Sequence, residues 1–260
     1  MTLEFFSATD TGRARSNNED SVAVHEAAGL AALADGMGGY NAGEVASSMV
    51  TSFIKSELGR WLGEASENAT DTEVRRAMDI CVDNANRAIF NAANSNPQYA
   101  GMGTTLVLAV FRAGRLLLGH VGDSRAYRLR GGRLTQATHD HSLLQEQIDA
   151  GLITAEQASF SANKNLVTRA VGVEDTVLLE THVHEVMPGD IYLLCSDGLS
   201  DMLDDESIGQ LLQSSPTLAE AGAALIDAAN DAGGKDNIAV VLARVGSMTE
   251  PPRSWWRFRR

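Results

Sequence analysis

The order in which strands and helices are predicted along the chain is the feature that most restricts its fold. Two predicted helices follow one another early in the sequence, one over residues 43–61 and one that begins at the capping box Thr70–Glu73. Apolar residues recur at helical spacing through the second of them. Strands are then predicted in succession between residues 105 and 130. Strands and helices in separate blocks indicate a layered α+β domain rather than alternating βαβ units.

The other predicted elements extend this pattern to residue 245. They are strands at residues 3–9, 22–25, 30–34, 177–186, 191–195 and 238–245, an irregular and partly helical stretch at 142–165, and a helix at 217–232. No break in composition divides residues 1–245, so we predict a single domain there. Residues 246–260 form a predicted tail outside it, which contains Pro251 and Pro252, four arginines and three aromatic residues.

The acidic balance of the chain argues against several classes of partner. The sequence has 21 Lys and Arg against 34 Asp and Glu, a net charge of −13, so its body should repel nucleic acid and anionic lipid. Membrane contact is expected only through the tail, where arginine and tryptophan suit an interface. The two cysteines make no disulfide framework, and neither a signal peptide nor a membrane-spanning run is evident. We expect a cytoplasmic monomer.

Four aspartates stand at the ends of predicted strands. Asp35 follows the apolar run 30–34, and Asp236 precedes the last strand. Asp123 and Asp197 each come shortly after a strand. Taken singly, an Asp-Gly pair is a common turn dipeptide. If the sheets bring the four carboxylates together, however, they repel one another and lose hydration unless a hard cation lies between them.

The pattern therefore predicts a site for Mg²⁺ or Mn²⁺, which prefer oxygen ligands. Gly36 has no side chain, so its carbonyl can approach a metal closely. Two cations about 3.5–4 Å apart would hold a bridging water, lower its pKa and aim it at phosphorus. Spacing alone does not show that the four aspartates meet.

Eight short motifs occur in the order and spacing of one known family. They are Asp10–Arg15 with Asn18–Asp20, Asp35–Gly39, Gly101–Thr105, Gly122–Arg125, Thr138–Ser142, Thr168–Gly172, Ser196–Leu199 and Lys235–Asn237. Over about residues 3–245 the sequence thereby resembles the metal-dependent protein phosphatases of the PPM (type 2C) family, in their compact bacterial form. The resemblance implies a four-layer αββα sandwich, with two central antiparallel sheets flanked by helices and a metal cluster in a cleft at one end.

The resemblance also implies roles for the metal ligands. Asp35 would bridge two core ions, with the Gly36 carbonyl on the first ion. Asp197 and Asp236 would bind the second ion. Asp123 would bind a third, weaker ion, which Asp197 would share.

Further residues would complete this site. Asp201 would also share the third ion. Glu19 and Asp20 would hold metal-bound waters, and Asn237 would lie beside the ligands. Arg15 would clamp the substrate phosphate, a role that suits a planar guanidinium with paired donors. We expect the arginine and the three core aspartates to carry catalysis.

The first aspartate loop departs from some family members at the position of the general acid. Chiefly eukaryotic members have a histidine directly after the Asp-Gly pair and are thought to use it as that acid. Here the residue is Met37, whose thioether cannot donate a proton. Tyr40 stands where bacterial members often have a histidine. A metal-bound water and Tyr40 are the candidates for the acid.

The function that the resemblance implies is hydrolysis of phosphoserine and phosphothreonine in proteins, with two core Mn²⁺ or Mg²⁺ ions and a weaker third. Phosphorylated proteins would be its substrates, and a Hanks-type kinase or a forkhead-associated-domain protein is an expected partner. The stretch 142–165 matches a flap that influences substrate choice in the family. The alternative is a catalytically silent member that acts as a regulatory binding module. Silent relatives typically lose metal aspartates, and this chain keeps them, so we favour the enzyme.

Other chemical patterns in the sequence have simpler explanations. Cys81 and Arg87 fit the C-x5-R pattern of cysteine-dependent phosphatases. Cys81 lies on the apolar stripe of a predicted helix without a glycine-rich loop, so we expect it in the core. Gly233–Lys235 lacks the other residues of a phosphate-binding P-loop.

Two pairs of histidines also need an explanation, and only the first of them suggests a zinc site. His182 and His184 share a strand face with Glu180, but no further ligands stand at zinc spacing, so we expect a solvated polar face. His139 and His141 belong to one of the motifs, and we expect a structural role for both.

Overall fold

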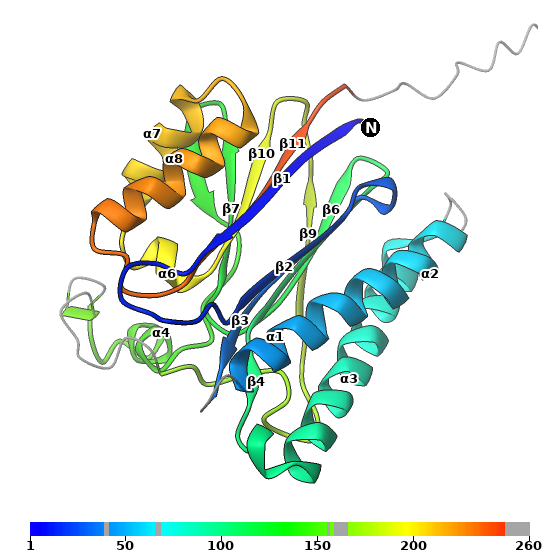
Figure 1. The fold of residues 1–260 in the computed structure, drawn as a ribbon. Coiled ribbons are helices and arrows are strands. Elements are labelled where there is room, and N and C mark those ends of the chain that lie inside the picture. Colours follow the sequence, from blue (N-terminus) through cyan, green and yellow to red (C-terminus); the bar gives the residue numbers. More distant parts are fainter. Residues whose placement is uncertain (39–41, 66–68, 155–156, 159–165, 248–260) are drawn as a thin grey trace, which may run out of the picture.

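Two antiparallel sheets form the centre of the molecule (Figure 1). The computed structural model describes residues 1–38, 42–65, 69–154, 157–158 and 166–247. The first sheet has the strand order β1-β11-β10-β7-β8, and the second has the order β2-β3-β5-β6-β9 with β4 paired to β3. The strands are β1 (Leu3–Asp10), β2 (Asp20–His25), β3 (Leu30–Met37), β4 (Gly103–Thr104), β5 (Leu106–Arg112), β6 (Arg115–Val121), β7 (Arg125–Arg130), β8 (Arg133–Gln136), β9 (Glu180–Glu185), β10 (Ile191–Cys195) and β11 (Ile238–Val245).

Helices cover the outer face of each sheet. The described helices are α1 (Ala42–Phe53), α2 (Gly59–Glu64), α3 (Asp71–Ser95), α4 (Leu143–Asp149), α6 (Asp197–Ser200), α7 (Asp205–Ser214) and α8 (Leu218–Asp231), with 3₁₀ turns at Glu26–Ala28 and Pro97–Tyr99. α1 and α3 pack on the second sheet, and α7 and α8 pack on the first. The four-layer αββα arrangement expected from the sequence is therefore confirmed. Among the described residues, no helix is both long and apolar enough to span a bilayer.

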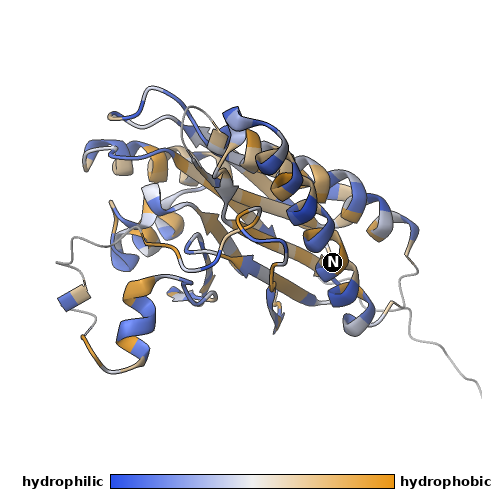
Figure 2. Cartoon of the chain, turned by 90° about the horizontal axis from the view of Figure 1, so that it is seen from below, coloured by the Kyte–Doolittle hydropathy of each residue, from blue (hydrophilic) through white to orange (hydrophobic). Residues whose placement is uncertain are grey.

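The layers follow from the alternation of side chains along the strands. On β3, Ala31 and Leu33 face the core between the sheets, whereas Leu30, Ala32 and Ala34 face the helices. Both faces are buried, so the central strands are almost continuously hydrophobic, while the helices expose hydrophilic faces (Figure 2). This packing fixes how far apart the ends of the two sheets lie.

Some elements differ from the sequence prediction. The helix expected at 43–61 continues to residue 64 and contains a π-helical segment, Ile54–Leu58. A Cβ at Gly59 would lie 2.8 Å from the His25 ring, so the glycine allows the helix to approach the sheet there. α7 and β8 were not predicted, because both are short and carry few apolar residues. The last strand of the second sheet begins at Glu180 rather than at residue 177.

The sheet registers bring several acidic residues to one end of the sandwich. Asp20 pairs with Asp35 across β2 and β3, and Asp10 pairs with Ile238 across β1 and β11. β6 and β10 also end on this side, just before Asp123 and Asp197. The ends of both sheets therefore contribute to a single polar region.

The N-terminus of α3 provides a direct test of the sequence prediction. Thr70 Oγ1 accepts the Glu73 N–H, and Glu73 Oε2 accepts the Thr70 N–H at 2.7 Å, so the expected capping box is present. Thr70→Ala should lower the free energy of unfolding by about 1 kcal/mol, because it leaves a helix N–H without its cap. Urea denaturation of the metal-free protein measures this. The control is Thr72→Ala, which changes an exposed threonine two residues further along, inside α3. An equal loss of stability in both variants would contradict the capping role.

Candidate metal centre

A cleft of about 400 Å³ lies where the ends of the two sheets meet. Of the residues predicted for the site, those that line it are Arg15, Glu19, Asp35, Gly36, Asp123, Asp197, Asp236 and Asn237. An adjoining pocket of about 290 Å³ is lined by Asp201 and shares Asp123 and Asp197 with the cleft. The four strand-end aspartates, separated by up to two hundred residues in sequence, are thus brought together.

Asp35 is held through its backbone. Its N–H donates to Thr105 Oγ1 at 3.0 Å, and its carbonyl accepts bonds from the Thr105 N–H and from Thr104 Oγ1. Ser124 shares a hydrogen bond of 2.7 Å with Thr105 Oγ1. The backbone of Asp35 is therefore fixed independently of its carboxylate, which remains available for a ligand.

Asp20 pairs with Asp35 across β2 and β3 but is not one of the residues that line the cleft. Ser196 donates a hydrogen bond of 2.7 Å to Asp20 Oδ2. The other carboxylate oxygen, Oδ1, is buried and has no hydrogen-bond partner within the described part of the chain. A buried anionic oxygen without a donor is costly, so this atom fits a role beside bound cations and their water.

The carboxylates oppose one another's ionisation. Burial raises the pKa of Asp35 well above its usual range, and the neighbouring charges of Asp20, Asp197 and Asp123 raise it further. Burial and nearby aspartates likewise raise the pKa of Asp197 to about 8, of Asp20 to about 7 and of Asp123 to about 6. Divalent cations would relieve this repulsion, and an all-oxygen donor set suits Mg²⁺ or Mn²⁺. The residues present therefore fit the metal centre expected from the sequence.

Arg15 is the cationic side chain among the described residues that line the cleft. Its Nη2 lies 2.7 Å from Asp236 Oδ2, and the guanidinium is half exposed. The hydrogen bond to Asp236 raises the pKa of Arg15, so the side chain stays charged. This places a planar donor group directly beside the aspartates.

Asn237 holds the loop that carries Arg15 and Glu19. Its Nδ2 donates to the carbonyls of Thr11 and Asn17, and its Oδ1 accepts the Glu19 N–H at 2.8 Å. The sequence motifs placed Asn237 beside the ligands, but they did not reveal this positioning role. Three hydrogen bonds from one buried side chain to residues more than two hundred positions away can be recognised only in the folded chain.

The floor of the adjoining pocket contains a buried ion pair. Arg125 binds both carboxylate oxygens of Asp140, through Nε and Nη2 at 2.7–3.1 Å, and Nη1 donates to Tyr127. Arg125 and Asp140 line this pocket together with Asp123, and both belong to sequence motifs, Gly122–Arg125 and Thr138–Ser142, that did not assign them a role. The two motifs did not reveal that Arg125 pairs with Asp140, which only the folded chain shows.

Three other residues complete the comparison with the sequence. Met37 lines the cleft, and Tyr40, the other residue considered for the general acid, lies outside the described residues. The tail from residue 248 onward also lies outside them. Cys81 is in the core, as expected, and burial raises the pKa of its thiol to about 11, which makes it a poor nucleophile.

Comparison with known proteins agrees with this geometry. A family model described as "Protein phosphatase 2C" matches residues 10–243. The chain belongs to the protein phosphatase 2C family. Serine/threonine protein phosphatase PstP of Mycobacterium tuberculosis is 42% identical over 248 residues, which are 94% of this chain and 45% of PstP. The chain thus spans about half the length of that relative.

Relatives of similar length and solved structures extend the comparison. Serine/threonine phosphatase stp of Listeria innocua is 38% identical over 90% of this chain and 92% of its own. The crystal structure of the M. tuberculosis phosphatase PstP/Ppp superposes with a TM-score of 0.85, at 40% identity, over 95% of this chain and all of that one. A structure of the PstP catalytic domain in complex with two manganese ions has a TM-score of 0.82 at 41% identity, over 94% of this chain and 99% of that one.

The raised carboxyl pKa values predict how stability depends on pH. An unfolded aspartate ionises near pH 3.8, whereas Asp197 in the folded chain ionises near pH 8. The folded chain therefore binds more protons than the unfolded chain in this interval, so metal-free protein should lose stability as pH rises, by about 1.4 kcal/mol per pH unit for each fully retained proton. Denaturation in chelator between pH 7.5 and 9, above the range in which unfolded histidines titrate, measures the slope.

The control for this prediction is Asp197→Asn, which removes one of the titrating carboxyls. Its stability should vary less with pH over the same interval. Metal-free stability that rises toward pH 9 in the unmodified chain would contradict the electrostatic description of the site.

Proposed function

We propose that this chain is a metal-dependent serine/threonine protein phosphatase that hydrolyses phosphoserine and phosphothreonine monoesters. The observation that carries the proposal is the convergence of Asp35, Asp123, Asp197 and Asp236 in one cleft, next to the guanidinium of Arg15. The relatives PstP and stp, which are named serine/threonine phosphatases, support the proposal.

The residues of the cleft divide into those that would hold metal and those that would support them. Asp35, the Gly36 carbonyl, Asp197 and Asp236 would hold two core ions, Mn²⁺ or Mg²⁺. Asp123 would hold a weaker third. Such ions supply Lewis acidity toward phosphate oxygens and make water nucleophilic near neutral pH.

The supporting residues act on the ligands and the substrate. Glu19 and Asp20 would accept hydrogen bonds from water in the site, and Asp201 would share the weaker third ion with Asp123 and Asp197. Arg15 would orient the phosphate with paired N–H donors. Met37 has no proton to give, so the leaving group would take its proton from Tyr40 or from water.

The physiological setting is part of the same proposal. The substrates would be phosphoproteins, with a Hanks-type kinase or a forkhead-associated-domain protein as partner, and the domain would act as a cytoplasmic monomer. Cys81 and Cys195 are free and buried, which agrees with a reducing compartment. A structural neighbour with a TM-score of 0.81 is described as PppA, a key regulatory component of T6SS in Pseudomonas aeruginosa, which supports a signalling role.

The central test removes one core ligand. Asp236→Ala should lower Mn²⁺-dependent hydrolysis of an aryl phosphate by about a thousandfold, because losing several kcal/mol of transition-state stabilisation costs a factor of ten per 1.4 kcal/mol. Asp231→Ala changes an exposed aspartate at the end of α8, which does not line the cleft, and should leave activity unchanged. An unmodified chain without chelator-sensitive hydrolysis would favour the silent binding module instead.

A second test separates substrate binding from activation of water. Arg15→Ala should raise KM for a phosphopeptide about tenfold and change kcat little, because the guanidinium would bind phosphate equally in the ground and transition states. The neighbouring exposed Arg13→Ala is the matched control. If calorimetry instead showed Mn²⁺ binding weakened in Arg15→Ala as severely as in Asp236→Ala, the arginine would be supporting the metal ligands rather than the substrate.

A further inference from the structure

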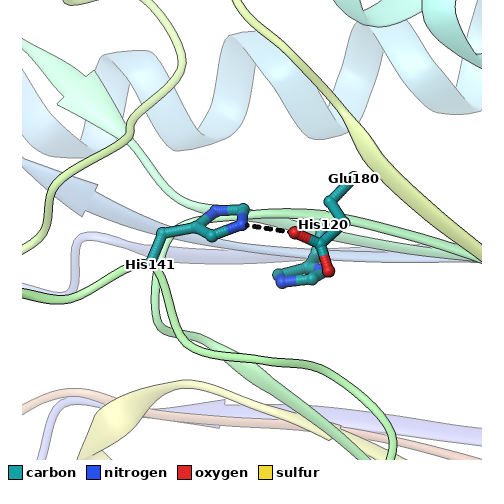
Figure 3. A group of neighbouring side chains, drawn as sticks. All are labelled: His120, His141 and Glu180. Carbon is teal, nitrogen blue, oxygen red and sulfur yellow. Dashed lines mark hydrogen bonds and ion pairs between the residues drawn. The ribbon is translucent and has the colours of Figure 1, made fainter. Parts of the chain in front are cut away.

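A cluster of two histidines and a glutamate lies beside the cleft and has no part in the proposed chemistry. His120 on β6 pairs across the sheet with Glu180 on β9, and His141 comes from the loop after β8 (Figure 3). The two imidazole rings are stacked, with centroids 4.6 Å apart and planes 15° apart. His120 is fully buried, and the His141 side chain is 4% exposed.

Two histidines and a carboxylate suggest a zinc site, but the hydrogen bonds exclude it. The Gly122 N–H donates to His141 Nδ1 at 3.1 Å, so Nδ1 carries a lone pair and the ring proton is on Nε2. That proton points to Glu180 Oε2, 3.1 Å away. His120 Nε2 likewise faces the His139 carbonyl at 2.7 Å and must donate to it. Only His120 Nδ1 then remains as a nitrogen ligand, which is too few for zinc.

The same bonds show what the cluster holds in place. The His141 backbone N–H donates to the Gly122 carbonyl at 3.0 Å, so one residue engages both backbone polar groups of Gly122. Gly122 has φ +103°, and a Cβ there would lie 2.7 Å from Thr105 Cγ2. Gly122 is thus confined by His141 on one side and by Thr105 on the other. The next residue is Asp123, which lines both the cleft and the adjoining pocket.

We propose that His141 is the positioning residue for Asp123. Glu180 holds the proton on His141 Nε2, the lone pair of Nδ1 fixes the Gly122 N–H, and the turn so formed directs Asp123 into the cleft. This inference rests on the proposed function, because it assigns Asp123 to the weaker metal ion. His141 and Glu180 would contribute to that site through the Gly122 turn, without binding the ion themselves.

The surroundings of His141 favour the neutral ring that this arrangement needs. Burial lowers its pKa, and the charge of Arg169 acts in the same direction. Glu180 acts against them. Arg169 Nη1 lies 3.4 Å from Nε2, but a guanidinium can only donate, so with the proton on Nε2 this contact is electrostatic and not a hydrogen bond. A second proton on Nδ1 would face the Gly122 N–H, placing two donors together without an acceptor.

The test compares two replacements of His141 in the full chain, with Mn²⁺ alone as the probe. His141→Asn keeps an acceptor, because Asn Oδ1 occupies the position of Nδ1. His141→Leu keeps bulk but leaves the Gly122 N–H without a partner. Calorimetry should show two tight ions in every variant, with the weaker ion bound at least about tenfold less tightly in the leucine variant. In the asparagine variant its affinity should remain within about threefold of the unmodified chain.

Two further variants complete the design. His139→Asn is the matched control, because His139 is exposed and two residues away, and it should leave all ions unaffected. Glu180→Leu removes the acceptor for the Nε2 proton while keeping both histidines, so it should also weaken the third ion. Glu180→Leu can therefore test the same role if His141→Leu does not fold.

A measurement on metal-free protein separates this inference from the proposed function. The ¹⁵N spectrum of the histidine rings should show His141 as the Nε2–H tautomer. A proton on Nδ1, or an equal loss of the third ion in the asparagine and leucine variants, would overturn the positioning role. If the unmodified chain bound no Mn²⁺ tightly, the proposed function would fail, and the tautomer would still decide whether His141 fixes the Gly122 turn.

Discussion

Mutual repulsion among carboxylates is the constraint on which the rest of the structure depends. Asp20, Asp35, Asp123 and Asp197 all have raised pKa values because burial and neighbouring negative charge oppose their ionisation. A flexible chain would separate these groups. The sandwich prevents this because each aspartate is attached to a strand whose two faces are packed, and Asp35 is further held by backbone bonds to Thr104 and Thr105.

The register of the strands determines which of these aspartates lie next to each other. Asp20 faces Asp35 only because β2 and β3 pair in one register, and a slip of one residue would turn alternate side chains from the core to the helices. The registers are in turn fixed by the three apolar layers, in which contacts such as the edge-to-face pair of Phe111 and Tyr192 lie between the sheets. Hydrophobic packing thus determines positions in the polar cleft.

The sequence pattern was sufficient for the layered α+β class and for placing Asp35, Asp123, Asp197 and Asp236 at strand ends. It did not show that the four aspartates meet; that expectation came from the family resemblance, and the folded chain brings them into one cleft. The sequence was also insufficient wherever one residue acts through a distant one. Asn237 bonds to Thr11 and Asn17, and His141 bonds to Gly122, without any local pattern that predicts either pair. Short elements such as α7 were missed for a different reason, because few apolar residues give too weak a periodicity.

The position of β11 has a consequence for how the protein folds during its synthesis. β11 is the last described strand in the sequence, yet it lies inside the first sheet, between β1 and β10. A ribosome delivers the N-terminal residues first, so β1 must remain without its neighbour until almost the whole domain has emerged, whereas the second sheet can pair earlier. Asp236 and Asn237 directly precede β11 and arrive in the same final step. The cleft is therefore completed only when synthesis of the domain ends, and an unfinished chain on the ribosome lacks the assembled site.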